Sequence, residues 1–222
     1  MRKEIYVLIG PAAIGKTTYL KEVGFPPLDT KFMSRDDIVD RLTDKYGYTY
    51  DELFIFPPSN ATLGSIIPGF EKYGEVIETP LVAKHICPVS YSIINSVNSE
   101  VYNTYYEEFE NAIKNPDIQY ITLDKVHMSK KERTIYFPYL KNNRSDFYVT
   151  AVLFNFQDPD TIDVISKLSE IRRKRIEQTG KFKTIPIEVQ QGMIDRYEEV
   201  TLAEGFDSIL KVDTLPKLRK LF

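Results

Sequence analysis

The stretch of sequence that decides the fold is residues 4–18, Glu4-Ile-Tyr-Val-Leu-Ile-Gly-Pro-Ala-Ala-Ile-Gly-Lys-Thr-Thr18. Its first half, Ile5 to Ile9, is a short apolar run that suits a parallel strand buried on both faces. Its second half fits the pattern G-x-x-x-x-G-K-[ST], in which a glycine-bounded loop joins a strand to a helix. The stretch therefore predicts a phosphate-binding loop between the first strand and the first helix.

This loop predicts a site for a nucleoside triphosphate such as ATP. Its backbone N–H groups would surround phosphate at the positive end of the following helix. Lys16 would reach the β- and γ-phosphates, and the Thr17 hydroxyl would ligate Mg²⁺. The alternative is a chance glycine turn, which the complete motif in its strand and helix context argues against. We expect ATP contacts from Gly10, Pro11, Ala12, Ala13, Ile14, Gly15, Lys16, Thr17 and Thr18.

Length and composition limit the class of protein. The 222 residues are enough for one domain with an insertion, and 42% hydrophobic with 27% charged residues is ordinary globular composition. A net charge of −3 without a long basic run disfavours a protein that coats long nucleic acid. The same net charge is compatible with a local basic pocket. The single cysteine fits a reducing compartment, and we see neither a membrane-spanning run nor a signal peptide. We therefore expect a cytoplasmic protein, and no protein partner is identifiable.

The rest of the chain alternates strand and helix patterns, which predicts a parallel β-sheet flanked by helices on both faces. An irregular insertion, residues 47–91, interrupts this order after the second helix; it is rich in aromatic residues that could stack on a base or simply pack. We expect further strands at 28–33, 118–124, 146–156 and 206–212, and helices at 17–23, 34–42, 91–113, 129–140, 160–178 and 187–200.

Asp36 follows the second predicted strand, and two interpretations of it stay open. Ser34 suits the N-cap position of a helix, and acids such as Asp36 and Asp37 in the first turn suit the helix dipole. In an α/β sheet, however, ligands lie beyond the carboxyl ends of the strands. A carboxylate at that place, beside the phosphate loop, could act as a general base toward a hydroxyl group.

Asp124 closes the strand predicted at 118–124. In phosphate-loop proteins such an acid often holds Mg²⁺ directly or through water, whereas a plain turn residue is the alternative. The next residue is Lys125, so the Glu that would activate water in a motor-type ATPase is missing. This favours transfer to an acceptor over hydrolysis.

Residues 172–186 are basic and lie beyond the fourth predicted strand. They include Arg172-Arg173-Lys174-Arg175 and Gly180-Lys181-Phe182-Lys183. Cations at a helix C-terminus are favourable by themselves. A lid that closes over the phosphates is the interpretation we favour, because phosphoryl transfer needs cations that meet the spreading charge.

Together these segments resemble the phosphate-loop (P-loop) kinases of the polynucleotide 5′-hydroxyl kinase type, particularly the phage members. Ser34-Arg35-Asp36-Asp37 resembles the segment whose first Asp is the general base, which maps to Asp36. The segments Asp124 to Arg133, Arg175 to Pro186 and Glu204 to Asp207 also resemble the family, so that the likeness covers most of the chain outside the insertion. No Asp-x-Asp-Gly-Thr phosphatase signature follows, so only the kinase half is matched.

The resemblance implies a P-loop kinase fold as a single domain over residues 1–222, with ATP and Mg²⁺ as cofactors and, for a phage protein, the host cytoplasm as its place. It implies ATP-dependent phosphorylation of a nucleic-acid hydroxyl, foremost a 5′-terminal one. A hydroxymethylated pyrimidine in phage DNA, a nucleoside or another small metabolite are alternative acceptors, and an ATP-dependent binding module or switch is a further alternative. The implied roles are catalysis for Lys16, Asp36 and Arg175, an ATP contact for Lys181, and substrate contacts for Arg35, Arg41 and Asp124.

The chain also departs from the family pattern. Ala13 replaces the usual third glycine of the loop, and Val39 stands where an acceptor-binding arginine is expected, with Arg41 two positions further along. Val126-His127 replaces the common Thr-Asn pair, and the second lid arginine falls near Thr179, for which Lys181 could substitute. Most of these changes fall on the acceptor side.

Overall fold

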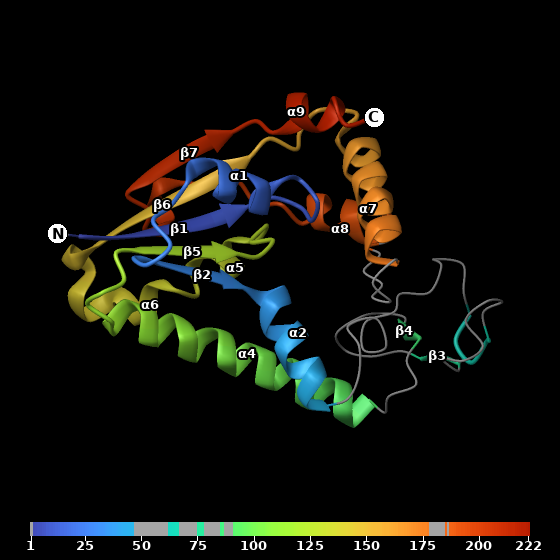
Figure 1. Cartoon of the computed structure of the whole chain (residues 1–222), viewed down its shortest axis with the longest axis horizontal. Coiled ribbons are helices and arrows are strands. Elements are labelled where there is room, and N and C mark those ends of the chain that lie inside the picture. The colour runs from blue at the N-terminus through green and yellow to red at the C-terminus, as the bar shows by residue number, and fades with distance from the viewer. Residues whose placement is uncertain are drawn as a thin grey trace.

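Five parallel strands form the central sheet, in the order β2-β5-β1-β6-β7. The structure is a computed structural model, and it describes residues 2–46, 62–66, 75–77, 85–86, 91–177, 185 and 187–222. The strands span Lys3–Ile9 (β1), Thr30–Ser34 (β2), Tyr120–Asp124 (β5), Phe147–Phe154 (β6) and Ser208–Val212 (β7). Because all five run in one direction, their carboxyl ends meet at one edge (Figure 1).

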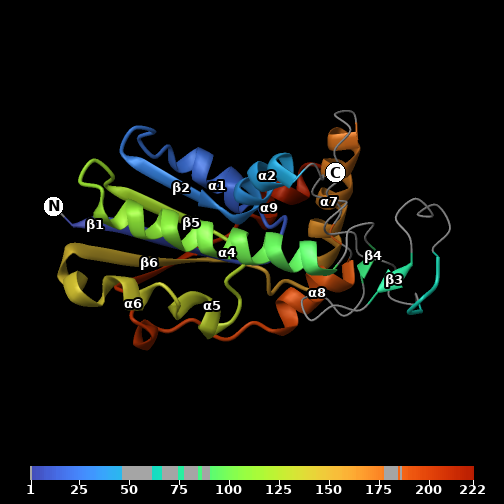
Figure 2. The same cartoon turned by 90° about the horizontal axis from the view of Figure 1, so that it is seen from below.

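Helices cover both faces of this sheet (Figures 1 and 2). The long helix α4 runs along one face together with α2 and the short α5 and α6, whereas α1, α7 and α9 contribute to the core on the other face. Their bounds are Lys16–Val23 (α1), Arg35–Tyr46 (α2), Tyr91–Lys114 (α4), Lys130–Thr134 (α5), Phe137–Leu140 (α6), Thr161–Glu177 (α7), Ile187–Asp195 (α8) and Leu215–Arg219 (α9). Short 3-10 turns span Lys141–Asp146 and Leu202–Glu204.

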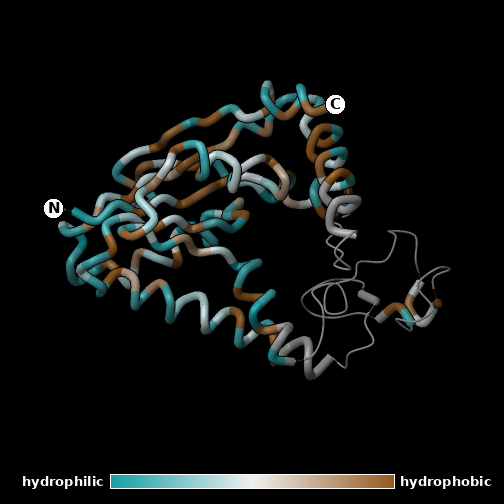
Figure 3. The backbone as a smooth tube through the Cα atoms, viewed as in Figure 1, coloured by the Kyte–Doolittle hydropathy of each residue, from teal (hydrophilic) through white to brown (hydrophobic). Residues whose placement is uncertain are grey.

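The apolar run of β1 explains why the sheet is buried on both sides. Ile5, Val7 and Ile9 pack into the core on the α4 side, whereas Leu8 packs into the core that contains residues of α1 and α7. Side chains of a strand alternate between faces, so a continuous apolar run serves both cores. Figure 3 shows the hydrophobic residues of these strands lying inside the helical layers.

Most predicted elements are present, and three helices end differently. The helix predicted over 34–42 continues to Tyr46. The helix predicted over 129–140 is divided into α5 and α6, because Pro138 lies in the first turn of a new helix. The helix predicted over 187–200 ends at Asp195. The backbone N–H of Glu198 donates to Met128 O at 3.0 Å, and Glu199 O accepts from Arg133 at 3.2 Å, so tertiary hydrogen bonds replace further helical turns there.

Within the predicted insertion the structure describes only short pieces. Val76–Ile77 (β3) pairs with His85–Ile86 (β4) in a two-stranded antiparallel sheet, and Ile66 forms a bridge with Glu75. The insertion aromatics considered as base-stacking candidates lie outside the described residues. Across the described part of the chain, no helix is both long and apolar enough to span a membrane.

Candidate active site

The phosphate loop, residues 10–15, leaves β1 and enters α1 through two left-handed backbone positions. Gly15 has a φ of 95° and Ala13 a φ of 67°. Ala13 therefore adopts the conformation that the family's usual glycine accepts freely, at a cost for alanine of roughly 1–2 kcal/mol. At Gly10 a Cβ would lie 3.0 Å from Ile14 Cγ2 and 3.1 Å from Phe154 Cβ, so a larger residue there would force these neighbours to shift. The predicted loop is present, with strain at one position.

Lys16 lies across this loop. Its side chain is buried, and Nζ donates hydrogen bonds to Gly10 O at 3.0 Å and Pro11 O at 2.8 Å. The hydroxyl of Thr214, which follows β7, donates to Ile14 O at 2.5 Å and ties the loop to the last strand. The lysine ammonium is thus held at the loop, where the motif places the phosphates of a nucleotide.

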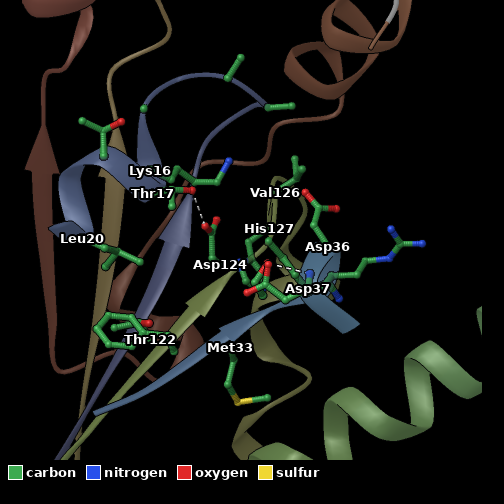
Figure 4. Close-up of a pocket in the computed structure, with 18 of the residues that line it drawn as sticks. Lys16, Thr17, Leu20, Met33, Asp36, Asp37, Thr122, Asp124, Val126 and His127 are labelled. Atoms are coloured by element: carbon green, nitrogen blue, oxygen red, sulfur yellow. Dashed lines mark hydrogen bonds between the residues drawn. The ribbon is translucent and has the colours of Figure 1, made fainter. Parts of the chain in front are cut away.

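Thr17 and Asp124 come together at the carboxyl ends of the strands. Thr17 Oγ1 donates to Asp124 Oδ2 at 2.9 Å, as Figure 4 shows. Burial raises the pKa of Asp124; the charge of Lys16 and the Thr17 hydrogen bond oppose this, and the negative charges of Asp36 and Asp37 add to it. The carboxylates of Asp36 and Asp37 therefore lie close enough to act on that of Asp124.

This hydroxyl and carboxylate pair is chemically suited to Mg²⁺, which prefers oxygen ligands and is usually held by one or two protein oxygens, water and phosphates. Among the described residues, no group of three or more His, Cys, Asp or Glu side chains is arranged to hold a metal by itself. A metal here would therefore depend on the phosphates of a bound nucleotide, with Thr17 and Asp124 as its protein contacts.

Asp36 lies in the first turn of α2 and lines the same cavity as Lys16, Thr17 and Asp124. Ser34 is the capping residue, because its Oγ accepts from Asp37 N at 3.3 Å. Figure 4 shows the Asp36 side chain in the cavity wall, above the strand ends and near Val126. The structure thus brings together the predicted base and the phosphate loop.

The two predicted arginines of α2 differ in position. Arg35 lines the cavity, and its Nη2 donates to Asn98 Oδ1 of α4 at 3.2 Å. Arg41 instead pairs with Glu108 of α4 at 2.5 Å and is absent from the described lining of the cavity. The structure therefore does not bring Arg41 to the site. Val39, where the resemblance expects an arginine, is fully buried in the core.

The cavity has a volume of about 1180 Å³. Single-ligand pockets are about 300–1,000 Å³, so this one is large enough to hold two substrates. Its described lining includes the phosphate loop, the starts of α1 and α2, parts of β2 and β5, the residues after β5, and Ile185, Met193 and Arg196.

The predicted lid is only partly described. Arg175 lies in α7, but the structure does not describe its side chain or those of the other residues of 172–177, and Lys181 lies wholly outside the described residues.

The segment Asp124 to Arg133, which also resembles the family, ends in an arginine that is buried away from solvent. Its guanidinium forms two hydrogen bonds of 2.8 Å to the Glu204 carboxylate and donates to Met128 O at 2.7 Å. Arg133 thus connects the segment after β5 to the turn before β7.

Sequence reasoning missed three side chains beside the site. Lys125 lines the cavity directly after Asp124, and Arg196 also lines it, with Nη2 3.7 Å from Glu132 Oε1. His127 is buried in the wall, with Nδ1 2.8 Å from Leu8 O and Nε2 2.6 Å from the Tyr136 hydroxyl. Burial lowers the pKa of His127 to about 3, so the ring is neutral. The rule that ligands gather beyond strand ends could have identified Lys125.

Comparison with known proteins places the fold. No family model and no curated protein matches the sequence. Among solved structures, a fungal RNA kinase matches with a TM-score of 0.51 and 12% identity, over 96% of this chain and 74% of that one. A candidate kinase of Chloroflexus aurantiacus matches at 0.52 and 14%, over 99% and 91%. A chain from the PezAT toxin–antitoxin system of Streptococcus pneumoniae matches at 0.54 and 12%, over 96% and 69%. These likenesses confirm the predicted α/β P-loop kinase fold.

Proposed function

We propose that this chain is an ATP- and Mg²⁺-dependent kinase that transfers the γ-phosphate to a hydroxyl of a nucleic acid, with a 5′-terminal hydroxyl as the favoured acceptor. One observation carries the proposal. The carboxylate of Asp36 lines the same cavity as the phosphate loop, Thr17 and Asp124. A nucleotide-binding switch needs the loop, but it does not need a carboxylate placed to accept a proton from an alcohol.

The residues divide the chemistry between them. Lys16 and the loop amides would bind the β- and γ-phosphates, and Thr17 with Asp124 would hold Mg²⁺, which supplies positive charge to the phosphate oxygens. Asp36 would accept the proton of the acceptor hydroxyl while the oxygen of that hydroxyl forms a bond to the γ-phosphorus. The bond from that phosphorus to the β–γ bridging oxygen breaks, and ADP leaves. Arg175 and Lys181 of the lid would neutralise the charge on the transferring group.

Three observations favour a nucleic-acid end as the acceptor. The cavity is large enough for a nucleotide and a second substrate. A fungal RNA kinase is among the solved structures that share the fold, and the segment Ser34 to Asp37 resembles the corresponding segment of polynucleotide kinases. We therefore place a nucleic-acid end ahead of a modified base or a nucleoside.

The first test separates catalysis from nucleotide binding. Asp36→Asn should lower transfer about 10²- to 10⁴-fold while ATP binding stays near normal, because only proton acceptance is removed. Asp163→Asn is the matched control, since Asp163 is an exposed acid in the first turn of α7 and does not belong to the described lining of the cavity. It should leave both properties unchanged. An equal loss of ATP binding and transfer in Asp36→Asn would show that Asp36 is a structural residue.

The second test identifies the acceptor. Labelled ATP is supplied with 5′-hydroxyl DNA, 5′-hydroxyl RNA, DNA containing hydroxymethyluracil, and free nucleosides in separate reactions. Label on the 5′ ends supports the proposal, whereas label on the modified base or on nucleosides reassigns the acceptor. Label on none of them would contradict the kinase and favour the switch.

A further inference from the structure

Lys125 is a cation of the cavity lining that the proposed chemistry does not use. It lies directly after Asp124, where β5 ends, and lines the cavity beside Arg35. Its Nζ lies 5.2 Å from the ring centroid of Tyr105 and 5.9 Å from that of Tyr106, both on α4. The ammonium is thus held over aromatic rings on the side of β5 that faces α4.

The surroundings of Lys125 favour a bound anion. Lys125 takes part in none of the ion pairs formed among the described residues, and the guanidinium of Arg35 lines the same cavity. A negatively charged ligand that reaches both of these cations would be bound favourably in this part of the cavity.

The position of this pair points to the acceptor rather than to ATP. The phosphate loop follows β1, whereas Lys125 follows β5, which is the next strand toward β2. The Lys125 ammonium also packs against the Tyr105 ring of α4. Arg35 precedes Asp36 in α2 and is held by Asn98 of α4. An acceptor whose hydroxyl lies at Asp36 would therefore have its neighbouring groups near Arg35 and Lys125.

We infer that Lys125 and Arg35 form an anion subsite that binds the phosphate next to the acceptor hydroxyl. The inference rests on the proposed function and narrows it, because an acceptor that fills the subsite carries a phosphodiester or phosphate within about one nucleotide of its hydroxyl. A free nucleoside would leave the subsite empty. The subsite also supplies a positive charge where Val39 replaces the arginine that the resemblance leads one to expect.

The experiment measures binding separately from transfer. The probes are a fluorescent 5′-hydroxyl trinucleotide and the same trinucleotide with a neutral methylphosphonate in place of its first linkage. Lys125→Met keeps a long side chain against the rings but removes the charge, and Lys125→Arg keeps the charge. Lys211→Met is the matched control, because Lys211 is exposed on β7 at the opposite edge of the sheet from β2.

Lys125→Met should weaken binding of the normal trinucleotide about tenfold to a hundredfold. This is the change in affinity that corresponds to losing one hydrogen bond to a charged group. It should leave the neutral probe and ATP unchanged, and Lys125→Arg should recover much of the loss. A similar loss for both probes, or no loss, would overturn the inference, and a loss confined to ATP would assign Lys125 to the nucleotide. If the wild-type protein binds the trinucleotide in this way but transfers no label, the proposed function fails and the anion subsite stands.

Discussion

Acid should destabilise this protein through His127. The ring is 1% exposed, Nδ1 lies 2.8 Å from Leu8 O, and Nε2 lies 2.6 Å from the Tyr136 hydroxyl. The carbonyl can only accept, so Nδ1 carries the proton and Nε2 accepts from Tyr136. Protonation would bury a charge beside Lys125 and Lys16, and the pKa is lowered from 6.5 to about 3 by burial first and by these cations.

The sign and size follow from linkage. Below pH 6.5 the unfolded chain takes up a proton at His127 that the folded chain refuses, so the free energy of unfolding falls as the pH drops toward 3. From pH 7 to pH 5 this amounts to about 2 kcal/mol. Because the folded-state pKa lies well below 5, the loss in this window is set almost wholly by the unfolded value.

Urea unfolding followed by circular dichroism at pH 7, 6 and 5 measures this loss. His127→Asn should lower stability at pH 7, since the Tyr136 contact is removed, but it should abolish about 2 kcal/mol of the pH dependence. Asn tolerates the left-handed backbone at this position, where φ is 51°. The raised pKa of Asp124 gives an effect of opposite sign that is present in both proteins and cancels in the comparison.

The matched control is His85→Asn, since His85 is the other of the two histidines. It should keep the slope of the wild-type protein. The reasoning is refuted if His127→Asn has the same pH dependence as the wild type. It is refuted equally if NMR of the wild-type protein shows the His127 ring titrating above pH 5.

Two further predictions concern packing. Arg133→Met leaves the buried Glu204 carboxylate without its guanidinium partner and should lower the free energy of unfolding by about 3–5 kcal/mol. Adding Glu204→Gln, which removes the buried charge, should restore part of that loss. If the double variant instead loses the sum of what the two single variants lose, the argument is contradicted. Gly10→Ala places a Cβ 3.1 Å from Phe154 Cβ and should cost about 1–3 kcal/mol in chemical unfolding. Its control, Gly192→Ala on α8, meets no atom within 4 Å and should be neutral or stabilising, so equal losses would refute the steric argument.

Part of the site was predictable because it depends on local sequence. The phosphate loop is fixed by glycines and an apolar strand that are consecutive in the chain, and the loop therefore forms as the motif predicts. The Ser34 cap of α2 and the end of β5 at Asp124 likewise follow from a few neighbouring residues. The same holds for the parallel sheet, since alternating strand and helix patterns allow few other arrangements.

Other contacts join residues far apart in the sequence, and no local pattern specifies them. Thr17 meets Asp124 across 107 positions, and Arg41 turns to Glu108 across 67. Arg41 is absent from the described lining of the cavity because its guanidinium pairs with Glu108. The choice between solvent, ligand and a carboxylate on α4 depends on how α2 and α4 pack.

The sequence by itself determined the loop, the order of strands and helices, and the acid that opens α2. Only the tertiary structure decided which charged side chains share the cavity. It placed Lys125 over the rings of α4 and beside Arg35, whereas it buried Arg133 against Glu204. The physical reason is that backbone preference acts over a few residues, whereas charge partners are set by the packing of whole elements against the sheet.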